Sequence, residues 1–304
     1  MNEAFLKLKI PELQTCLSIS EINKGFSGDK KYLVEFEGGS NYFLRTASLS
    51  DYPRKEAEFK ILKVMKNDEV LAQEPIKLGK IEELGICYYL LTYLEGRDAS
   101  ELLPNLTEKQ QYEIGWRAGK DLATMNAYPA PITIDSWYDR IMEKHHRYVN
   151  AYRTCGLRIK GDEKILEYIE NNHHYIKNRP NRFQHDDFHV GNILVNGGEY
   201  GGVIDFNRFD WGDPFHEFVK VALFSLEVSV PFSRGQINGY FNQGVPEEFW
   251  KLYCLYTGMN IFSSIVWSLK VTPDRIEEMM ERLYRILGEH KYFELEKPEW
   301  YSQV

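Results

Sequence analysis

The pattern of apolar and polar residues changes near residue 96. Before it, short runs rich in β-branched and aromatic residues predict strands at residues 19–23, 31–36, 41–46, 70–78 and 86–94. The pair Gly38-Gly39 predicts a tight hairpin turn between two of these strands. A helical repeat occupies residues 53–65, and residues 1–18 predict a short helix that is broken near Pro11. The first part of the chain is therefore predicted to be an antiparallel sheet with one main helix.

Beyond residue 96 the apolar positions recur at helical spacing. Thr107, with Gln110 three residues later, predicts a capped helix that extends to Asn126. Further helices are predicted at 134–152, 162–177, 234–243, 246–270 and 273–290. Residues 252–269 carry no charge and are about as long as the shortest membrane-spanning helix. Their polar Thr, Asn and Ser residues favour a buried core helix instead.

Two acidic centres flank a predicted hairpin in the middle of the chain. Residues 184–206 read QHDDFHVGNILVNGGEYGGVIDF. Asp187 is followed five residues later by Asn192, and Asp205 ends the apolar pair Val203-Ile204. Residues 193–195 and 203–204 predict two strands joined by a glycine-rich turn. Such a hairpin would bring Asn192 and Asp205 together at one end, with Asp187 on the loop that leads in.

These three residues are the types that phosphoryl transfer requires. Asp187 would orient an acceptor hydroxyl and accept its proton, and Asn192 and Asp205 would offer the hard oxygen ligands that Mg²⁺ prefers. Protein kinases use Asp, Asn and Asp in this order. Two alternatives remain open at this point. The stretch would otherwise be two ordinary acidic loops, or His185, His189 and Asp187 would form the metal site of a hydrolase.

The motif H-D-D-x-x-x-x-N at residues 185–192, followed by I-D-F at 204–206, resembles the aminoglycoside phosphotransferase and choline kinase-like family. That family carries H-G-D-x-x-x-x-N, so Asp186 replaces a glycine here. Gly212-Asp213-Pro214 fits the pattern as well. The resemblance implies an α+β, bilobal protein-kinase-like fold. A small N-lobe (1–95), with an antiparallel sheet and one helix, would bind the nucleotide. A larger, mostly helical C-lobe (96–304) would carry the catalytic loop and the acceptor-binding helices.

The resemblance also implies the reaction and its ligands. ATP or GTP would donate a phosphoryl group with Mg²⁺ as cofactor, and the acceptor would be a hydroxyl of a small molecule. Aminoglycosides are the first expectation, with choline-like alcohols and macrolides as alternatives. Asp187 would be the catalytic base, and Asn192 and Asp205 the metal ligands.

Further nucleotide-binding residues are expected in the N-terminal part by the same resemblance. The glycine turn with Gly25, Ser27 and Gly28 would cover the phosphates, because glycine allows the backbone to approach them closely. Main-chain groups near Thr92 and Leu94 would pair with the purine edge, at the connection between the lobes.

Arg45 lies on the third strand, where the family has a lysine that contacts the phosphates and pairs with a helix glutamate. Glu56 is our choice for that partner and Glu58 is the alternative, since the two lie about 200° apart around the helix. Arginine keeps the charge but has a longer, planar fork. The departures at Arg45 and Asp186 leave open a nucleotide-binding protein without catalysis.

The C-terminal helices bear features that would suit an acceptor. Glutamates are frequent there and are accompanied by aromatic residues, which together would bind an amino-sugar or another cationic acceptor. These glutamates are Glu277, Glu278, Glu281, Glu289, Glu294, Glu296 and Glu299. The helix at 134–152 is rich in His and Tyr and would either line a substrate cleft or face solvent. Asp213 is expected to cap the helix that Pro214 begins.

Composition limits the remaining possibilities. The 304-residue chain is 43% hydrophobic, which is enough for a large core, and its net charge of −8 argues against a nucleic-acid partner. Four scattered cysteines without a C-x-x-C pair make a zinc or redox site unexpected. The start lacks the apolar segment of a signal peptide, so a cytoplasmic protein without membrane contact is expected. The chain would act as a monomer or homodimer.

Overall fold

The computed structural model describes residues 3–23 and 28–302, and the chain divides into two compact units. Unit 1 consists of Met1–Arg97 and Gly201–Asn207, and unit 2 consists of Asp98–Tyr200 and Arg208–Val304. Unit 1 therefore includes a short segment from the middle of the chain. Asp205 lies on that segment, whereas Asp187 and Asn192 belong to unit 2.

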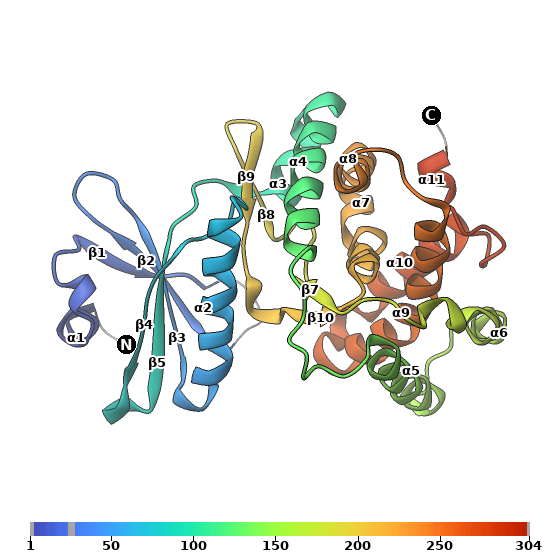
Figure 1. Cartoon of the computed structure of the whole chain (residues 1–304), viewed down its shortest axis with the longest axis horizontal. Coiled ribbons are helices and arrows are strands. Elements are labelled where there is room, and N and C mark those ends of the chain that lie inside the picture. The colour runs from blue at the N-terminus through green and yellow to red at the C-terminus, as the bar shows by residue number, and fades with distance from the viewer. Residues whose placement is uncertain (1–2, 24–27, 303–304) are drawn as a thin grey trace. The chain divides into compact units, whose positions relative to one another are not determined.

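Unit 1 is built on a five-stranded antiparallel sheet in the order β1–β2–β3–β5–β4. The strands are β1 (Ser18–Glu21), β2 (Lys30–Glu35), β3 (Tyr42–Ser48), β4 (Pro75–Ile81) and β5 (Ile86–Thr92). Helix α2 (Tyr52–Asn67) packs against β4 and β5 (Figure 1). Its buried Phe59, Leu62 and Met65 recur every three residues and form the face that contacts the sheet.

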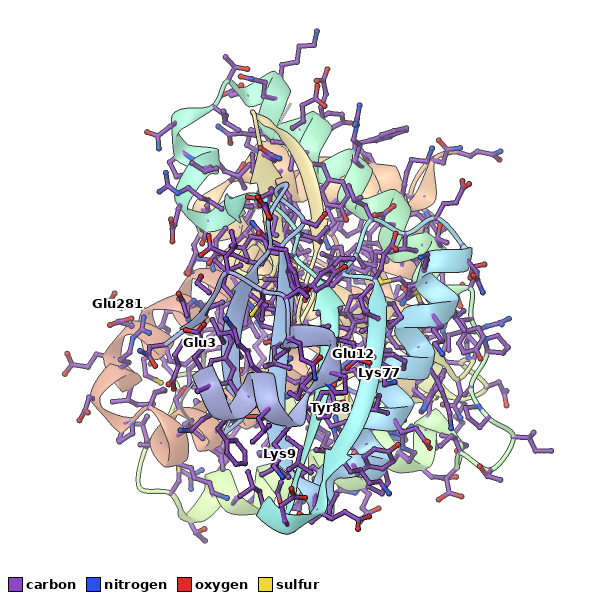
Figure 2. The ribbon with its side chains drawn as sticks, turned by 90° about the vertical axis from the view of Figure 1, so that its left-hand side faces the viewer. Glu3, Lys9, Glu12, Lys77, Tyr88 and Glu281 are labelled. Atoms are coloured by element: carbon purple, nitrogen blue, oxygen red, sulfur yellow. The ribbon has the colours of Figure 1, made fainter. Side chains whose placement is uncertain are left out.

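The N-terminal helices α1 (Glu3–Lys9) and η1 (Pro11–Leu13) contribute to the buried core of unit 1. Leu6, Ile10 and Leu13 are fully buried in one cluster with residues of β2, β3 and β5. At the surface, Glu12 and Lys77 point toward each other beside Tyr88 (Figure 2), and their charged atoms lie 3.2 Å apart. This ion pair ties η1 to β4.

The predicted strand at residues 70–78 begins later than expected. β4 starts at Pro75, and Val70 and Ala72 are buried outside the five-stranded sheet. The amide of Val203 donates to the carbonyl of Leu71 at 2.9 Å. The apolar run is therefore buried beside the 201–207 segment, and its hydrophobicity alone did not distinguish this from a place in the sheet.

Unit 2 is mostly helical, and its predicted helices are present with small changes at their ends. The helices are α3 (Ala99–Leu102), α4 (Glu108–Asn126), α5 (Trp137–Thr154), α6 (Asp162–Asn172), α7 (Leu226–Val228), α8 (Val230–Phe241), α9 (Glu247–Val271), α10 (Ile276–Glu289) and α11 (Glu299–Ser302). Thr107 and Gln110 form the predicted capping box of α4. Helix α9 is buried around most of its circumference, and in the described ranges no helix has the length and apolarity needed to cross a membrane.

Helices α4 and α8 lie side by side (Figure 1) and pack unusually closely through glycines. A Cβ atom on Gly119 would lie 2.0 Å from the carbonyl oxygen of Gln236, and one on Gly239 would lie 2.0 Å from that of Trp116. Gly115 and Gly235 meet backbone at the same short range. Only glycine allows this approach, so these positions fix the helix pair.

Two small sheets flank the central motif. β7 (Arg182–Gln184) pairs with β10 (Asp210–Gly212), and β8 (Ile193–Asn196) lies between β6 (Arg97–Asp98) and β9 (Glu199–Val203). The predicted hairpin is present as β8 and β9, but its turn is shorter than expected. Only Gly197 and Gly198 lie in the turn, whereas Gly201 and Gly202, also predicted there, lie within β9. Residues 185–192 form the loop between β7 and β8, which we call the Asp187 loop.

Candidate active site

The Asp187 loop is anchored by buried side chains. His185 and Phe188 are fully buried, and Val190 is nearly so. The loop also receives a main-chain hydrogen bond, from the amide of Ser100 to the carbonyl of Val190 at 3.1 Å. Apolar anchors alternate with the polar residues that remain partly accessible, so Asp187 and Asn192 are presented on a fixed backbone.

Asp186, the departure from the family motif, has a left-handed backbone with φ of +58°. Glycine adopts this conformation freely, and Asp tolerates it better than most residues do. The Asp186 amide donates to Oε1 of Glu217 at 3.2 Å. Burial of Glu217, together with the charge of Asp186, raises the pKa of Glu217 to about 8. The substitution is therefore compatible with the loop conformation that a glycine would give.

Asp187 is held at both carboxylate oxygens. Oδ2 accepts a hydrogen bond from the side-chain amide of Asn192 at 3.2 Å, and Oδ1 lies 3.2 Å from the ammonium of Lys220. The Nε2 atom of His189 lies 3.6 Å from Oδ1. Burial alone would raise the pKa of Asp187, but His189 and Lys220 outweigh it and hold this pKa well below its ordinary value. Asp187 is therefore an oriented carboxylate at neutral pH.

Asn192 is oriented so that its amide oxygen remains for another ligand. Its Nδ2 donates to the carbonyl of Asp187 at 2.9 Å as well as to the carboxylate. Because both donations use the nitrogen, Oδ1 is the hard ligand atom that a divalent cation would contact. Asp205 offers carboxylate oxygens on a side chain that is 32% exposed. An amide oxygen and a carboxylate are ligand types that fit Mg²⁺.

Asp205 belongs to a charged cluster in unit 1, centred on Arg45. Nη1 of Arg45 donates to Oδ1 of Asp205 at 3.0 Å, and Nη2 lies 3.3 Å from Oδ2 of Asp29. Oε1 of Glu58 lies 3.9 Å from Nη1. Burial would lower the pKa of Arg45, but Tyr89 and the carboxylates raise it overall. The guanidinium is 3% exposed and is surrounded by these acidic partners.

Two lysines of this cluster were missed by sequence reasoning. The ammonium of Lys55 lies 2.6 Å from Oδ2 of Asp29 and 2.7 Å from Oδ1 of Asn207. Lys31 stands opposite Arg45 in the register of β2 and β3, and burial lowers its pKa. A two-residue turn at Gly38-Gly39 would have placed Lys31 opposite Thr46, so the sequence did not predict the observed register. The one sequence signal for the burial of Lys55 is its position on the apolar side of α2.

The choice of Glu56 as the partner of Arg45 is wrong. Glu56 is paired with Lys60 at 2.9 Å on the exposed side of α2. Glu58, the alternative, is 1% exposed, accepts a hydrogen bond from the Tyr89 hydroxyl at 3.1 Å and faces Arg45. Burial raises the pKa of Glu58 above its ordinary value, and the nearby cations offset this only in part. Periodicity showed that only one of the two could face inward, but not which.

The other expected nucleotide contacts differ in what the structure says of them. Gly25 and Ser27 lie outside the described residues, and Gly28 is exposed with open space around its Cα. The amide of Thr92 donates to the carbonyl of Glu74 at 2.9 Å, and its carbonyl accepts from Gln73 at 3.2 Å. The main-chain groups of Leu94 have no hydrogen-bond partner in the part of the chain that the structure describes. Of the two residues, only Thr92 has its main-chain groups engaged by other described residues.

The histidines of the loop are placed for structure. His185 is buried edge-on against Phe188, with 5.8 Å between ring centroids, and Nδ1 of His189 accepts from the amide of Gly191 at 3.0 Å. Within residues 3–23 and 28–302, no group of three or more His, Cys, Asp or Glu side chains is arranged to hold a metal ion. The hydrolase hypothesis lacks the ligand set on which it depended.

Asp213 has the expected capping role. Its Oδ1 accepts from the amide of Phe215 at 3.1 Å, with Pro214 at the first helical position of η7 (Pro214–Phe218). Arg179 donates to both carboxylate oxygens, and the Tyr256 hydroxyl donates to Oδ2 at 2.8 Å. This fully buried carboxylate braces the segment that carries Glu217 and Lys220.

Together, the antiparallel sheet with one long helix and the helical unit with the Asp187 loop define a protein-kinase-like small-molecule phosphotransferase fold. A family model described as the phosphotransferase enzyme family matches residues 18–249. Because the match covers most of the chain, the chain belongs to this family. The predicted α+β kinase-like fold is confirmed. A comparison with curated protein sequences found no match.

Solved structures agree with this fold. A GDP complex of a mutant aminoglycoside 2'-phosphotransferase-IIIa has a TM-score of 0.70 at 16% identity, covering 97% of this chain and 98% of the other. A mutant of aminoglycoside phosphotransferase APH(4)-Ia, in a ternary complex with ADP and hygromycin B, has a TM-score of 0.65 at 17% identity. The match covers 94% of this chain and 97% of the other. The gentamicin complex of APH(2")-IIa has a TM-score of 0.66 at 15% identity, covering 94% of this chain and 97% of the other.

Proposed function

We propose that this protein transfers the γ-phosphoryl group of ATP or GTP to a hydroxyl of a small molecule. The observation that supports this most is the Asp187 carboxylate, which is held by Asn192 and Lys220 and kept ionised. It would accept a hydrogen bond from the acceptor hydroxyl and direct its oxygen at the γ-phosphorus. The new P–O bond forms as the bond to the β–γ bridging oxygen breaks. ADP or GDP leaves, and the hydroxyl proton passes to Asp187.

The low pKa of Asp187 limits what it contributes. A strong base is not required, because the phosphoryl transition state is loose and the hydroxyl proton becomes acidic only late in the reaction. Orientation of the hydroxyl is then the main contribution of Asp187, and it requires the fixed geometry of the carboxylate.

The remaining roles follow from the two charged clusters. Asn192 and Asp205 would hold Mg²⁺, which neutralises phosphate charge when it is bound. Arg45, with Lys31 beside it on the neighbouring strand, would contact the phosphates, and Glu58 would keep Arg45 in position. Leu94 would offer its main chain to the purine. The GDP and ADP complexes of the structural neighbours support a nucleoside triphosphate as donor.

The acceptor is less well supported. Hygromycin B and gentamicin are present in structures of the neighbours, which favours an aminoglycoside. The cationic-acceptor expectation rested on the glutamates of the last helices, however, and several of these are already engaged. Glu278 pairs with Arg275, Glu294 with Lys164 and Glu299 with Lys291. These pairs weaken the argument for an acidic, polycation-binding surface.

Thermal melting tests the proposal. With Mg²⁺ and millimolar ATP or GTP, the melting temperature of the full chain is expected to rise, since a ligand that binds only the folded state stabilises it. Release of ADP or GDP on adding aminoglycosides, macrolides or amino-alcohols would then identify an acceptor. Nucleotide binding without any turnover would instead support the non-catalytic alternative. The absence of a shift with either nucleotide would contradict the proposal.

A further inference from the structure

A small cavity in unit 2 lies apart from the residues assigned to the phosphotransfer reaction. It lies between α5, η7 and α9 and has a volume of roughly 20 Å³, which is enough for one water-sized group. Its lining residues are Ile141, Lys144, His145, Tyr148, His216, Tyr256, Met259, Asn260 and Ser263. The cavity can therefore receive one functional group of a ligand rather than a whole sugar.

Two buried imidazoles line this cavity. His145 and His216 are 7% and 6% exposed, and the Nδ1 atom of each lacks a hydrogen-bond partner among the described residues. Burial lowers the pKa of His145 to about 4 and that of His216 well below its ordinary value, so both rings are neutral at pH 7. Leaving a buried polar group unpaired is destabilising. Two together indicate a site that is completed by something else.

The charge of the lining is positive. Lys144 is its only charged residue, and within the described chain its ammonium has neither an ion pair nor a hydrogen bond. The charges that act on His216 are Lys144, Lys220 and Asp210. Asp210 is already paired with Arg140 at 2.5 Å. Among the described residues that line the cavity, no carboxylate balances Lys144.

The cavity is close to the Asp187 loop within the same unit. His216 precedes Glu217, which accepts from the amide of Asp186. Lys220, whose charge acts on His216, contacts Asp187. A small molecule with its hydroxyl at Asp187 would thus have another part near Lys144.

We propose that this cavity receives one oxygen of a carboxylate of the acceptor, with Lys144 as the counter-ion and His145 and His216 as hydrogen-bonding neighbours. The proposal rests on the proposed phosphotransfer in that it assigns the ligand to the acceptor. It predicts hydroxylated acids as substrates and disfavours polycationic aminoglycosides.

The test titrates the full chain with sodium acetate, with acetamide and with methylammonium chloride, at constant ionic strength. These probes are similar in size and differ in charge. The imidazole ¹H–¹⁵N signals of His145 and His216 report on the cavity. Acetate is expected to shift both in a saturable manner, and the other two probes are not. A saturable response to methylammonium, or none to acetate, would overturn the proposal.

Lys144→Met tests the counter-ion, and Lys109→Met is the control. Lys109 is 85% exposed on α4, so its substitution removes the same charge from a position away from the cavity. Acetate affinity should fall by about tenfold or more in Lys144→Met, since a hydrogen bond to a charged group is lost. It should be unchanged in Lys109→Met. Equal affinities in the two variants would refute the role of Lys144, and the wild-type titration stands even if one variant misfolds.

The acceptor assignment is tested by comparing hydroxylated acids with the corresponding hydroxylated amines for release of ADP. Turnover with the acids supports it, and turnover with the amines alone contradicts it. A melting shift with Mg²⁺ and ATP in the same preparation reports on the nucleotide site separately. If acetate does not shift the imidazole signals but Mg²⁺ and ATP still raise the melting temperature, the cavity proposal is rejected and the phosphotransfer proposal is not.

Discussion

Asp205 and Asp187 are two aspartates with opposite surroundings. Asp205 in unit 1 lies in a cluster where Arg45, Lys31 and Lys55 meet several carboxylates. Asp187 in unit 2 is held by one amide and one ammonium, both at 3.2 Å. The first arrangement concentrates charge, and the second fixes the direction of one carboxylate.

Under the proposed function, this difference would divide the work of phosphoryl transfer between the two clusters. A dense, buried charge cluster suits the phosphates of a nucleotide and a metal ion, because cations already in position need little reorganisation. A single oriented carboxylate suits a neutral hydroxyl, which needs a hydrogen-bond acceptor rather than a counter-ion. Substitutions in the two clusters should therefore separate binding from turnover.

The largest effect is expected from Asp187→Ala. Loss of the oriented acceptor should lower kcat by about 10²- to 10⁴-fold, while the melting shift with Mg²⁺ and nucleotide remains nearly unchanged. Steady-state kinetics and melting on one preparation measure both. Asp274→Ala, at an exposed position of unit 2, is the control. Full activity in Asp187→Ala would show that this residue is not the base.

Asp205→Asn should differ from Asp187→Ala in its dependence on Mg²⁺. Removal of the carboxylate charge should lower kcat by about 100-fold or more at fixed Mg²⁺, and should raise the Mg²⁺ concentration needed for half-maximal rate. Nucleotide binding without Mg²⁺ should change less. The exposed Asp68→Asn on the end of α2 should resemble the wild type. An unaltered Mg²⁺ dependence in Asp205→Asn would remove Asp205 from the metal site.

Lys220→Met should act through Asp187 and lower kcat by about 10- to 100-fold, as partners of functional groups commonly do. Lys220 helps to lower the pKa of Asp187, so activity of the wild type should persist below the ordinary value of 3.8 as far as the fold allows. The ionised carboxylate also stabilises the fold above that pH, and this contribution is lost as the pH falls through the folded-state pKa.

In Lys220→Met the acid limb of the pH–rate profile should move upward, and the stabilisation from Asp187 should become smaller. Profiles of kcat/KM measured between pH 4 and 8 would show the first change, and melting over the same range the second. Lys220→Arg should restore most of the wild-type profile. A parallel loss of rate at every pH would indicate a structural role only.

Glu217→Gln should change stability more than chemistry. Burial raises the folded-state pKa of Glu217 from 4.5 to about 8, so its protonated form stabilises the fold below 4.5 and this contribution is lost as the pH rises toward 8. Glutamine stays neutral and still accepts from Asp186. The variant should gain up to a few kcal/mol over the wild type between these pH values. Denaturant unfolding at pH 5 and 8 tests this, with the exposed Glu247→Gln as control.

Asp186→Gly should have the smallest effect. Glycine accepts the φ of +58° without strain, so the free energy of unfolding should change by less than about 1 kcal/mol and kcat by little. Asp186→Val should be clearly less stable, because a β-branched residue resists the left-handed conformation. Equal stability of the Gly and Val variants would show that backbone conformation does not explain the glycine of the family motif.

Much of the candidate site was predicted from local sequence alone. Asp187, Asn192, Asp205 and the hairpin between them lie within one short stretch, so their spacing was enough to propose them together. The capping of α4 by Thr107 and of η7 by Asp213 was predicted for the same reason. Each of these depends on residues a few positions apart, whose geometry follows from the backbone.

The sequence by itself determined the elements, their caps and the three residues of the phosphotransferase motif. Only the tertiary structure showed that Glu58 rather than Glu56 faces Arg45, and that Lys220, 33 residues from Asp187, holds its carboxylate. It also showed the cavity beside Lys144. The physical reason is that periodicity fixes which residues share a face of an element, whereas charge pairing and cavities depend on what another element places opposite that face.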